Sequence, residues 1–163
     1  MFVTLLIMIA CGGASTDPAA PVEAPPVVAP AADPHAAHKS MDHMAVMAAT
    51  RDRLRAELGD AYDPPVPGLD TADASRGKTL YDASCAACHG AAGKGDGAAG
   101  AGLSPPPADF TDTFHAAYYS DAGRVRIIEK GSPDTAMVGF EGSLDHAQIL
   151  DVYAHVRTLR VAP

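Results

Sequence analysis

The sequence has no tryptophan, few aromatic residues and only three cysteines. Aromatic residues make up 6% of the 163 positions, which is little for a large self-sufficient hydrophobic core. Basic residues are also few, and the net charge of -8 disfavours nucleic acid and anionic membrane surfaces as partners. The sequence offers no convergent set of acid, base and nucleophile groups. These features favour one modest domain, whose core a bound apolar group would complete, over an enzyme.

Two of the three cysteines lie three positions apart, in the stretch SCAACHG at residues 84–90. Cys85 and Cys88 can clamp a metal, form a redox disulfide, or react with the vinyl groups of a porphyrin. A zinc site needs two more soft ligands, but the sequence offers only Cys11 and no second CxxC pair. A thioredoxin-like pair expects alternating strands and helices, which the Gly-, Ala- and Pro-rich flanks do not supply. Because His89 follows Cys88 directly, we expect covalent haem attachment with His89 as an iron ligand.

The N-terminus, MFVTLLIMIACGG, is an apolar run that ends in a small residue followed by Cys11. The run is too short to span a bilayer as a helix. We interpret residues 1–10 as a signal peptide similar to those of bacterial lipoproteins, in which the cysteine after the cleavage site is acylated. The alternatives are an ordinary secretory signal and a short membrane-buried tail. The two signal-peptide interpretations both export the chain.

Two segments separate this signal from the CxxCH region. Residues 11–37 are rich in Pro and Ala, and we expect a disordered, semi-extended tether. Residues 38–70 form a His- and Met-rich segment with an amphipathic helix, capped by Asp42 and ending near Leu58. Soft side chains in this region can hold Cu(I): His35, His38, Met41, His43, Met44 and Met47. Packing of this helix on the haem domain or on a partner is the favoured interpretation, because Met commonly fills irregular apolar contacts.

Residues 71–163 are expected to form a helical domain. One helix begins after Asp73 and leads into the CxxCH motif, and a second begins with a capping box at Asp145 and carries one apolar face. A glycine inside a helix weakens it, so Gly77 indicates that another helix comes close. We therefore expect the two helices to cross, with Tyr153 near this glycine.

The segment between these helices is expected to be mostly loop. Its first part is rich in glycine and ends in three consecutive prolines, and a carbonyl in residues 105–107 is the expected acceptor for the second ring nitrogen of His89. A short helix over residues 122–129 follows, and a turn then leads to Met137. Taken alone, Met137 can be either a core residue or a second ligand to haem iron.

Five stretches in this order resemble a bacterial class I cytochrome c domain over residues 71–160: RGKTLYDASCAACHG, GKGDG, PPPADF, GSPDTAMVGF and LDVYAHVRTL. The resemblance implies an all-α fold in which the N- and C-terminal helices cross around one covalent haem c. It implies Cys85 and Cys88 as thioether sites, His89 as the proximal ligand and Met137 as the distal ligand.

The resemblance also implies a function. We expect an exported mono-haem electron carrier, not an enzyme, that exchanges electrons with redox proteins or a respiratory complex. Lipidation at Cys11 would hold it on the periplasmic side of a bacterial membrane, and a soluble periplasmic protein is the alternative. Two other functions remain open: a haem protein with an open distal site, such as a peroxidase or gas sensor, and a copper-handling protein. Three more histidines could compete for the iron: His115, His146 and His155.

Overall fold

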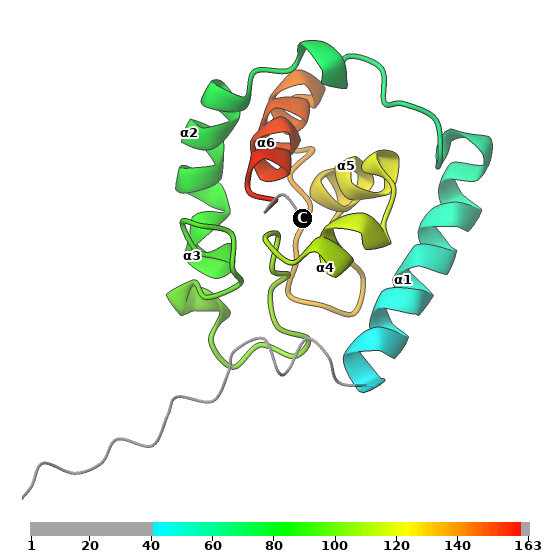
Figure 1. Ribbon diagram of the computed structural model, residues 1–163, viewed down its shortest axis with the longest axis vertical. Coiled ribbons are helices and arrows are strands. Elements are labelled where there is room, and N and C mark those ends of the chain that lie inside the picture. Colours follow the sequence, from blue (N-terminus) through cyan, green and yellow to red (C-terminus); the bar gives the residue numbers. More distant parts are fainter. Residues whose placement is uncertain (1–40, 161–163) are drawn as a thin grey trace, which may run out of the picture. The chain divides into compact units, whose positions relative to one another are not determined.

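A computed structural model describes residues 41–160 of the chain (Figure 1). Its α-helices are α1 (Met41–Leu58), α2 (Ala74–Ser84), α3 (Ala86–His89), α4 (Thr113–Tyr118), α5 (Asp121–Lys130) and α6 (His146–Thr158). Short 3-10 helices lie at η2 (Gly59–Ala61), η3 (Leu69–Thr71) and η4 (Ala98–Gly100). Within residues 41–160 there is no strand, only an isolated bridge between Gly131 and Val138. The all-α prediction is confirmed, whereas the predicted signal peptide and tether lie outside the described residues.

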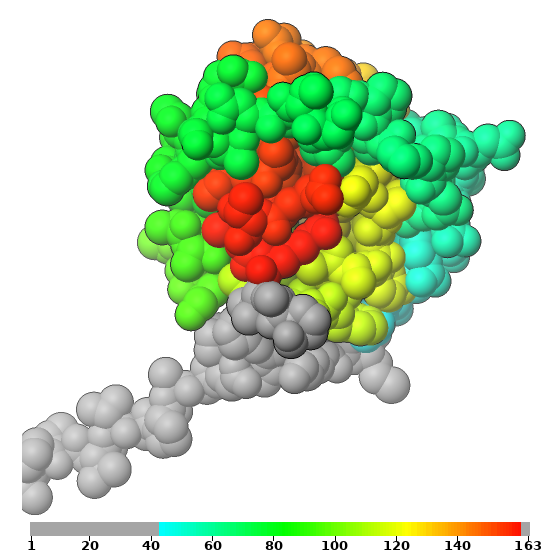
Figure 2. All heavy atoms as spheres, turned by 45° about the horizontal axis from the view of Figure 1, so that its top comes forward, coloured from blue at the N-terminus to red at the C-terminus, as the bar shows by residue number. Residues whose placement is uncertain are grey.

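Helices α2 and α6 cross so closely that their backbones touch. A Cβ atom at Gly77 would lie 1.8 Å from the carbonyl oxygen of Asp151, so only glycine permits this approach. The crossing is confirmed, but the residues that meet Gly77 are Asp151 and Val152, whereas Tyr153 was predicted there. Figure 2 shows α6 in red, flanked by α2 in green and α5 in yellow.

Side-chain hydrogen bonds cap the starts of α2 and α6, and one of them joins the two helices. Asp73 caps α2 by accepting from the backbone N–H groups of Ser75 and Arg76, and Asp145 and Gln148 form the predicted capping box of α6. The fully buried carboxylate of Asp151 accepts from the backbone N–H of Asp73 at 2.7 Å and pairs with Arg76. One α6 side chain therefore fixes the first turn of α2.

Helix α1 packs against α5 on the opposite side of the fold from α2 (Figures 1 and 2). Its buried side chains recur along one face: His43, Met47, Thr50 and Leu54. Prediction located this helix and its end near Leu58, but it did not identify His43 and Thr50 as buried residues. Asp42 lies inside the helix and is not its N-cap. No helix in residues 41–160 combines the length and apolar character needed to cross a membrane.

Candidate functional site

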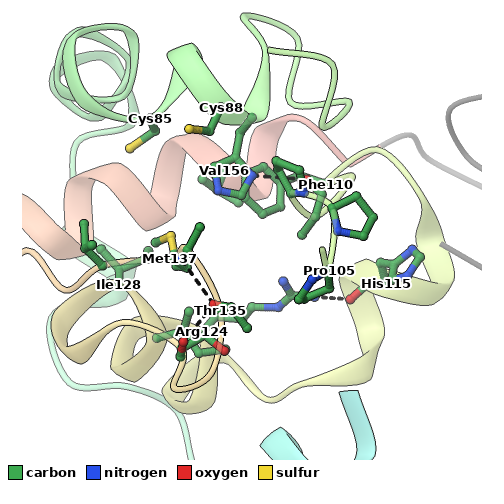
Figure 3. A pocket seen from close by; sticks show the side chains of 18 of the residues that line it. Cys85, Cys88, Pro105, Phe110, His115, Arg124, Ile128, Thr135, Met137 and Val156 are labelled. Carbon is green, nitrogen blue, oxygen red and sulfur yellow. Dashed lines mark hydrogen bonds between the residues drawn. The ribbon is translucent and has the colours of Figure 1, made fainter. Parts of the chain in front are cut away.

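A cavity of about 250 Å³ is bordered by all six α-helices of the described residues and the loops between them (Figure 3). Its lining is mostly apolar and includes Val46, Leu103, Ile127, Ile128, Phe140 and Val156. The four residues expected to bind haem also line it, namely Cys85, Cys88, His89 and Met137. The fold therefore brings together a CxxCH motif and a methionine that lies 48 positions after its histidine.

The two cysteines are presented on one helical turn. Cys85 ends α2 and begins α3, and its carbonyl accepts from the N–H groups of Cys88 at 3.2 Å and His89 at 2.9 Å. Both thiols are free and half-buried. Burial, reinforced by the neighbouring Cys88, raises the pKa of Cys85 to about 11, so this thiol is neutral at physiological pH.

The imidazole of His89 is held from one side. Its Nδ1 atom lies 3.2 Å from the carbonyl oxygen of Ala108, so Nδ1 carries the proton and Nε2 is left for a metal. The predicted acceptor in residues 105–107 is wrong by one position, and the Pro107 carbonyl oxygen instead faces Gly95. The Phe110 ring stacks on the imidazole, with centroids 4.6 Å apart. Burial lowers the pKa of His89, against the opposite effect of the Ala108 hydrogen bond, and this favours the neutral imidazole that metals bind.

The glycine-rich loop wraps closely over the cysteine turn. A Cβ atom at Gly97 or at Gly100 would lie 2.6 or 2.7 Å from the carbonyl oxygen of Cys88. On the other side, the buried Tyr81 hydroxyl donates to the carbonyl of Gly90 at 2.8 Å. These contacts explain why glycines accumulate here, since the loop must pass the turn without side chains in between.

Met137 sits at the end of a tight turn across the cavity from the cysteines (Figure 3). The Met137 carbonyl accepts from the Ser132 N–H at 2.9 Å, and its own N–H donates to the Thr135 hydroxyl at 3.1 Å. Gly131 and Asp134 adopt positive φ angles of 81° and 61°, which allow the chain to reverse. The turn thus presents a half-buried thioether to the cavity.

Arg124 brings a buried positive charge to the cavity lining. The side chain is 8% exposed, its guanidinium donates to the carbonyl oxygen of His115, and it lies 4.9 Å from the Tyr119 ring centroid. Within residues 41–160 no carboxylate forms an ion pair with it, and burial lowers its pKa. An uncompensated buried cation indicates a ligand with negative charge. Sequence reasoning missed Arg124, because α5 carries five charged residues and nothing in the local sequence marks this one as buried.

The remaining histidines differ in position. His115 is buried and lines the cavity, with its Nε2 atom 3.2 Å from Nε2 of His43 on α1. His146 is exposed and lies 2.9 Å from Glu129, whereas His155 is buried against Tyr81, and neither lines the cavity. Of the four histidines considered as iron ligands, His89 and His115 therefore border the site.

The proposed copper cluster lies only partly within the described residues. His35 and His38 are outside them, and His43 and Met47 face the interior rather than a common surface site. Over residues 41–160, no group of three or more His, Cys, Asp or Glu side chains is arranged to hold a metal ion. The described structure therefore does not support the copper hypothesis.

The residues around the cavity fit a covalently bound haem. The set consists of two free thiols, an imidazole with one ring nitrogen to spare, a thioether across an apolar space and a buried cation. The family model for cytochrome c matches residues 74–160 of this chain. A search of curated protein sequences finds no match. The chain belongs to the cytochrome c family, whose members carry haem c and transfer electrons.

Proposed function

We propose that this chain is an exported mono-haem c-type cytochrome that passes single electrons between redox proteins, with His89 and Met137 as the axial iron ligands. The observation that carries this proposal is that both residues line the same apolar cavity as Cys85 and Cys88. When bound, haem c supplies an iron that cycles between the ferrous and ferric states by one electron.

The protein residues have separate roles in this proposal. Cys85 and Cys88 anchor the porphyrin through thioether bonds. The Ala108 carbonyl and the Phe110 ring fix the orientation of His89, and the hydrogen bond raises its basicity as a ligand. The Met137 thioether would close the remaining coordination position, favour the ferrous state, and exclude dioxygen and peroxide.

Haem attachment can be tested by the mass of the full-length protein produced in a bacterium that performs covalent haem maturation. The expected mass exceeds that of the polypeptide by one haem, and the double variant Cys85→Ser/Cys88→Ser should lack this increment. The same spectrum reports any lipid on Cys11. A colourless wild-type protein without the increment would contradict the proposal.

The Met137 assignment is tested with a pair of volume-conserving substitutions. Met137→Leu should convert six-coordinate low-spin iron to a form that binds carbon monoxide or peroxide readily. Met44→Leu serves as the control, because Met44 is a half-buried methionine outside the cavity lining, and its spectrum should equal the wild type. An unchanged low-spin spectrum in Met137→Leu would exclude Met137 as ligand. Ligand binding to the wild type would instead favour an open-site peroxidase or gas sensor.

We further propose that a lipid on Cys11 anchors the chain on the periplasmic side of a bacterial membrane. The motif at residues 1–11 supports this proposal. Fractionation tests it: wild-type protein should be in the membrane fraction, and Cys11→Ser should move to the soluble periplasmic fraction. Equal distribution of the two proteins would contradict the anchor and favour a soluble carrier.

A further inference from the structure

We propose that helix α1 completes the haem pocket, and that its His43, together with His115 and Arg124, forms the subsite for the carboxylate groups of the haem. Helix α1 lies outside residues 74–160, which match the family model. The proposal rests on the proposed function, because it requires a covalently attached haem.

Helix α1 contributes directly to the cavity wall. Four of its side chains line the cavity: His43, Val46, Met47 and Thr50. Several contacts hold this wall in place. The Tyr119 hydroxyl donates to the Met47 carbonyl at 3.3 Å, the Arg51 guanidinium lies 4.7 Å from the Tyr118 ring centroid, and Arg126 pairs with Glu57. The helix therefore belongs to the cofactor-binding unit.

The polar side chains that α1 meets gather at one end of the cavity. In Figure 3, Arg124 extends toward Pro105 and His115, on the side of the cavity away from Cys85. His43 reaches the same place, since its Nε2 atom lies 3.2 Å from that of His115. A porphyrin of this type has its vinyl groups and its carboxylates on opposite edges. Attachment through the cysteines therefore turns the carboxylates toward the basic end.

Charge compensation gives this placement a physical reason. The buried Arg124 guanidinium forms no ion pair with a carboxylate among residues 41–160, and such a charge is costly unless an anion accompanies it. Carboxylates of the haem would supply that anion. The two histidines can contribute further positive charge beside Arg124, because a nearby anion favours their protonated forms.

His115, one member of the histidine pair, is subject to opposing influences. Burial, His43 and Arg124 lower the pKa of His115, while Asp112 at the start of α4 and Asp109 in the preceding loop raise it. The Nε2 atoms of the two rings lie 3.2 Å apart, so protonation of one ring affects protonation of the other. A change of one unit of charge in the adjacent pocket should therefore shift its protonation.

This coupling has a definite sign. Adding an electron from a redox partner makes the pocket more negative by one charge, which raises the pKa of the pair, so a proton from solvent binds more tightly to the reduced protein. Reduction then becomes harder as pH rises between the pKa values of the pair in the oxidised and reduced protein. At full coupling the reduction equilibrium changes tenfold per pH unit, which corresponds to about 59 mV for one electron.

The experiment is spectroelectrochemical titration of full-length haem-loaded protein between about pH 5 and about pH 9, a range that brackets histidine titration. The wild-type midpoint potential should fall with pH within a window of this range, and His43→Gln should flatten the dependence. The matched control is His155→Gln, because His155 is also buried but does not line the cavity. Its pH dependence should equal that of the wild type.

A second substitution at the same position keeps the proposal testable if His43→Gln does not fold. His43→Phe keeps an aromatic ring at this position but cannot bind a proton, and it should flatten the pH dependence as His43→Gln does. The proposal is overturned if the wild-type potential does not change with pH, or if both His43 variants keep the wild-type dependence. Either result would leave the proposed electron carrier intact, because haem attachment is read separately from the mass and the visible spectrum.

Discussion

Two helix contacts border the haem pocket, and they are built differently. At the α2–α6 crossing, a Cβ atom on Gly77 would lie 1.8 Å from the backbone carbonyl oxygen of Asp151. At the α1–α5 contact, a Cβ atom on Gly123 would lie 3.1 Å from the ring of Tyr62 and 3.4 Å from Leu54. The first contact meets backbone and the second meets side chains. The crossing within the family region therefore cannot accept an added side chain, whereas the contact of the additional helix can adjust to one.

The largest effect is expected from Gly77→Ala. Because the methyl group would overlap a backbone carbonyl, α2 and α6 must separate, and the free energy of unfolding should fall by more than about 3 kcal/mol. Denaturant unfolding of the haem-loaded protein measures this loss. Gly142→Ala is the control, since nothing lies within 4 Å of an added Cβ there. Similar stability of the two variants would show that the backbones of α2 and α6 are not in close contact at Gly77.

A smaller loss is expected when the polar connection at the same crossing is weakened. Asp151→Asn removes the charge and one of the two oxygens that receive hydrogen bonds from Asp73 N–H and Arg76. Loss of a charge-assisted hydrogen bond should lower the free energy of unfolding by about 2 kcal/mol. Asp82→Asn removes an exposed ion pair with Lys78 and should cost less than about 0.5 kcal/mol, as thermal unfolding would report. Equal losses in the free energy of unfolding for the two variants would mean that burial does not strengthen the hydrogen bonds of Asp151.

At the α1–α5 contact, Gly123→Ala should change the free energy of unfolding by less than about 1 kcal/mol. Alanine gains about 1 kcal/mol of helix propensity over glycine, and small movements of Tyr62 and Leu54 offset part of it. Denaturant unfolding alongside Gly77→Ala gives the comparison directly. A loss as large as that of Gly77→Ala would show that α1 is packed as rigidly as α6.

The smallest effect at neutral pH is expected from His155, which lies in the α2–α6 contact beside Tyr81. Burial lowers the pKa of His155, so the unfolded chain binds a proton more readily than the folded one. Its contribution to stability is therefore present above the ordinary histidine pKa of about 6.5 and is lost as pH falls below it. As pH falls through the ordinary histidine pKa, the free energy of unfolding should decline less steeply in His155→Gln than in the wild type. Parallel profiles would show that His155 does not contribute.

Much of the fold could be predicted from local signals. The caps at Asp73 and Asp145, the glycine at position 77 and the apolar period of the last helix located α2, α6 and their crossing, because each depends on residues close in sequence. Helix α4 was missed, since its six residues are too few to show a period. Its only local signal was Asp112, which caps it.

The residues of the candidate site could be chosen from the sequence where one motif contains them, and they were missed where distant segments build the site. Cys85, Cys88 and His89 lie within one turn, so their spacing alone was informative. The His43–His115 contact joins residues 72 positions apart, and the local pattern of α1 does not show that His43 faces inward. The Ala108 carbonyl was missed by one position, because the path of an irregular loop depends on tertiary packing.

The position of His43 at the start of α1 has a mechanical consequence. The backbone that leads into α1 enters the described fold at the helix turn that carries His43. Each of the contacts named above between α1 and its neighbours involves a side chain, whereas α2 and α6 meet backbone to backbone at Gly77. A displacement of the start of α1 would therefore strain the basic end of the cavity, where His43 meets His115, before it strains the cysteine turn.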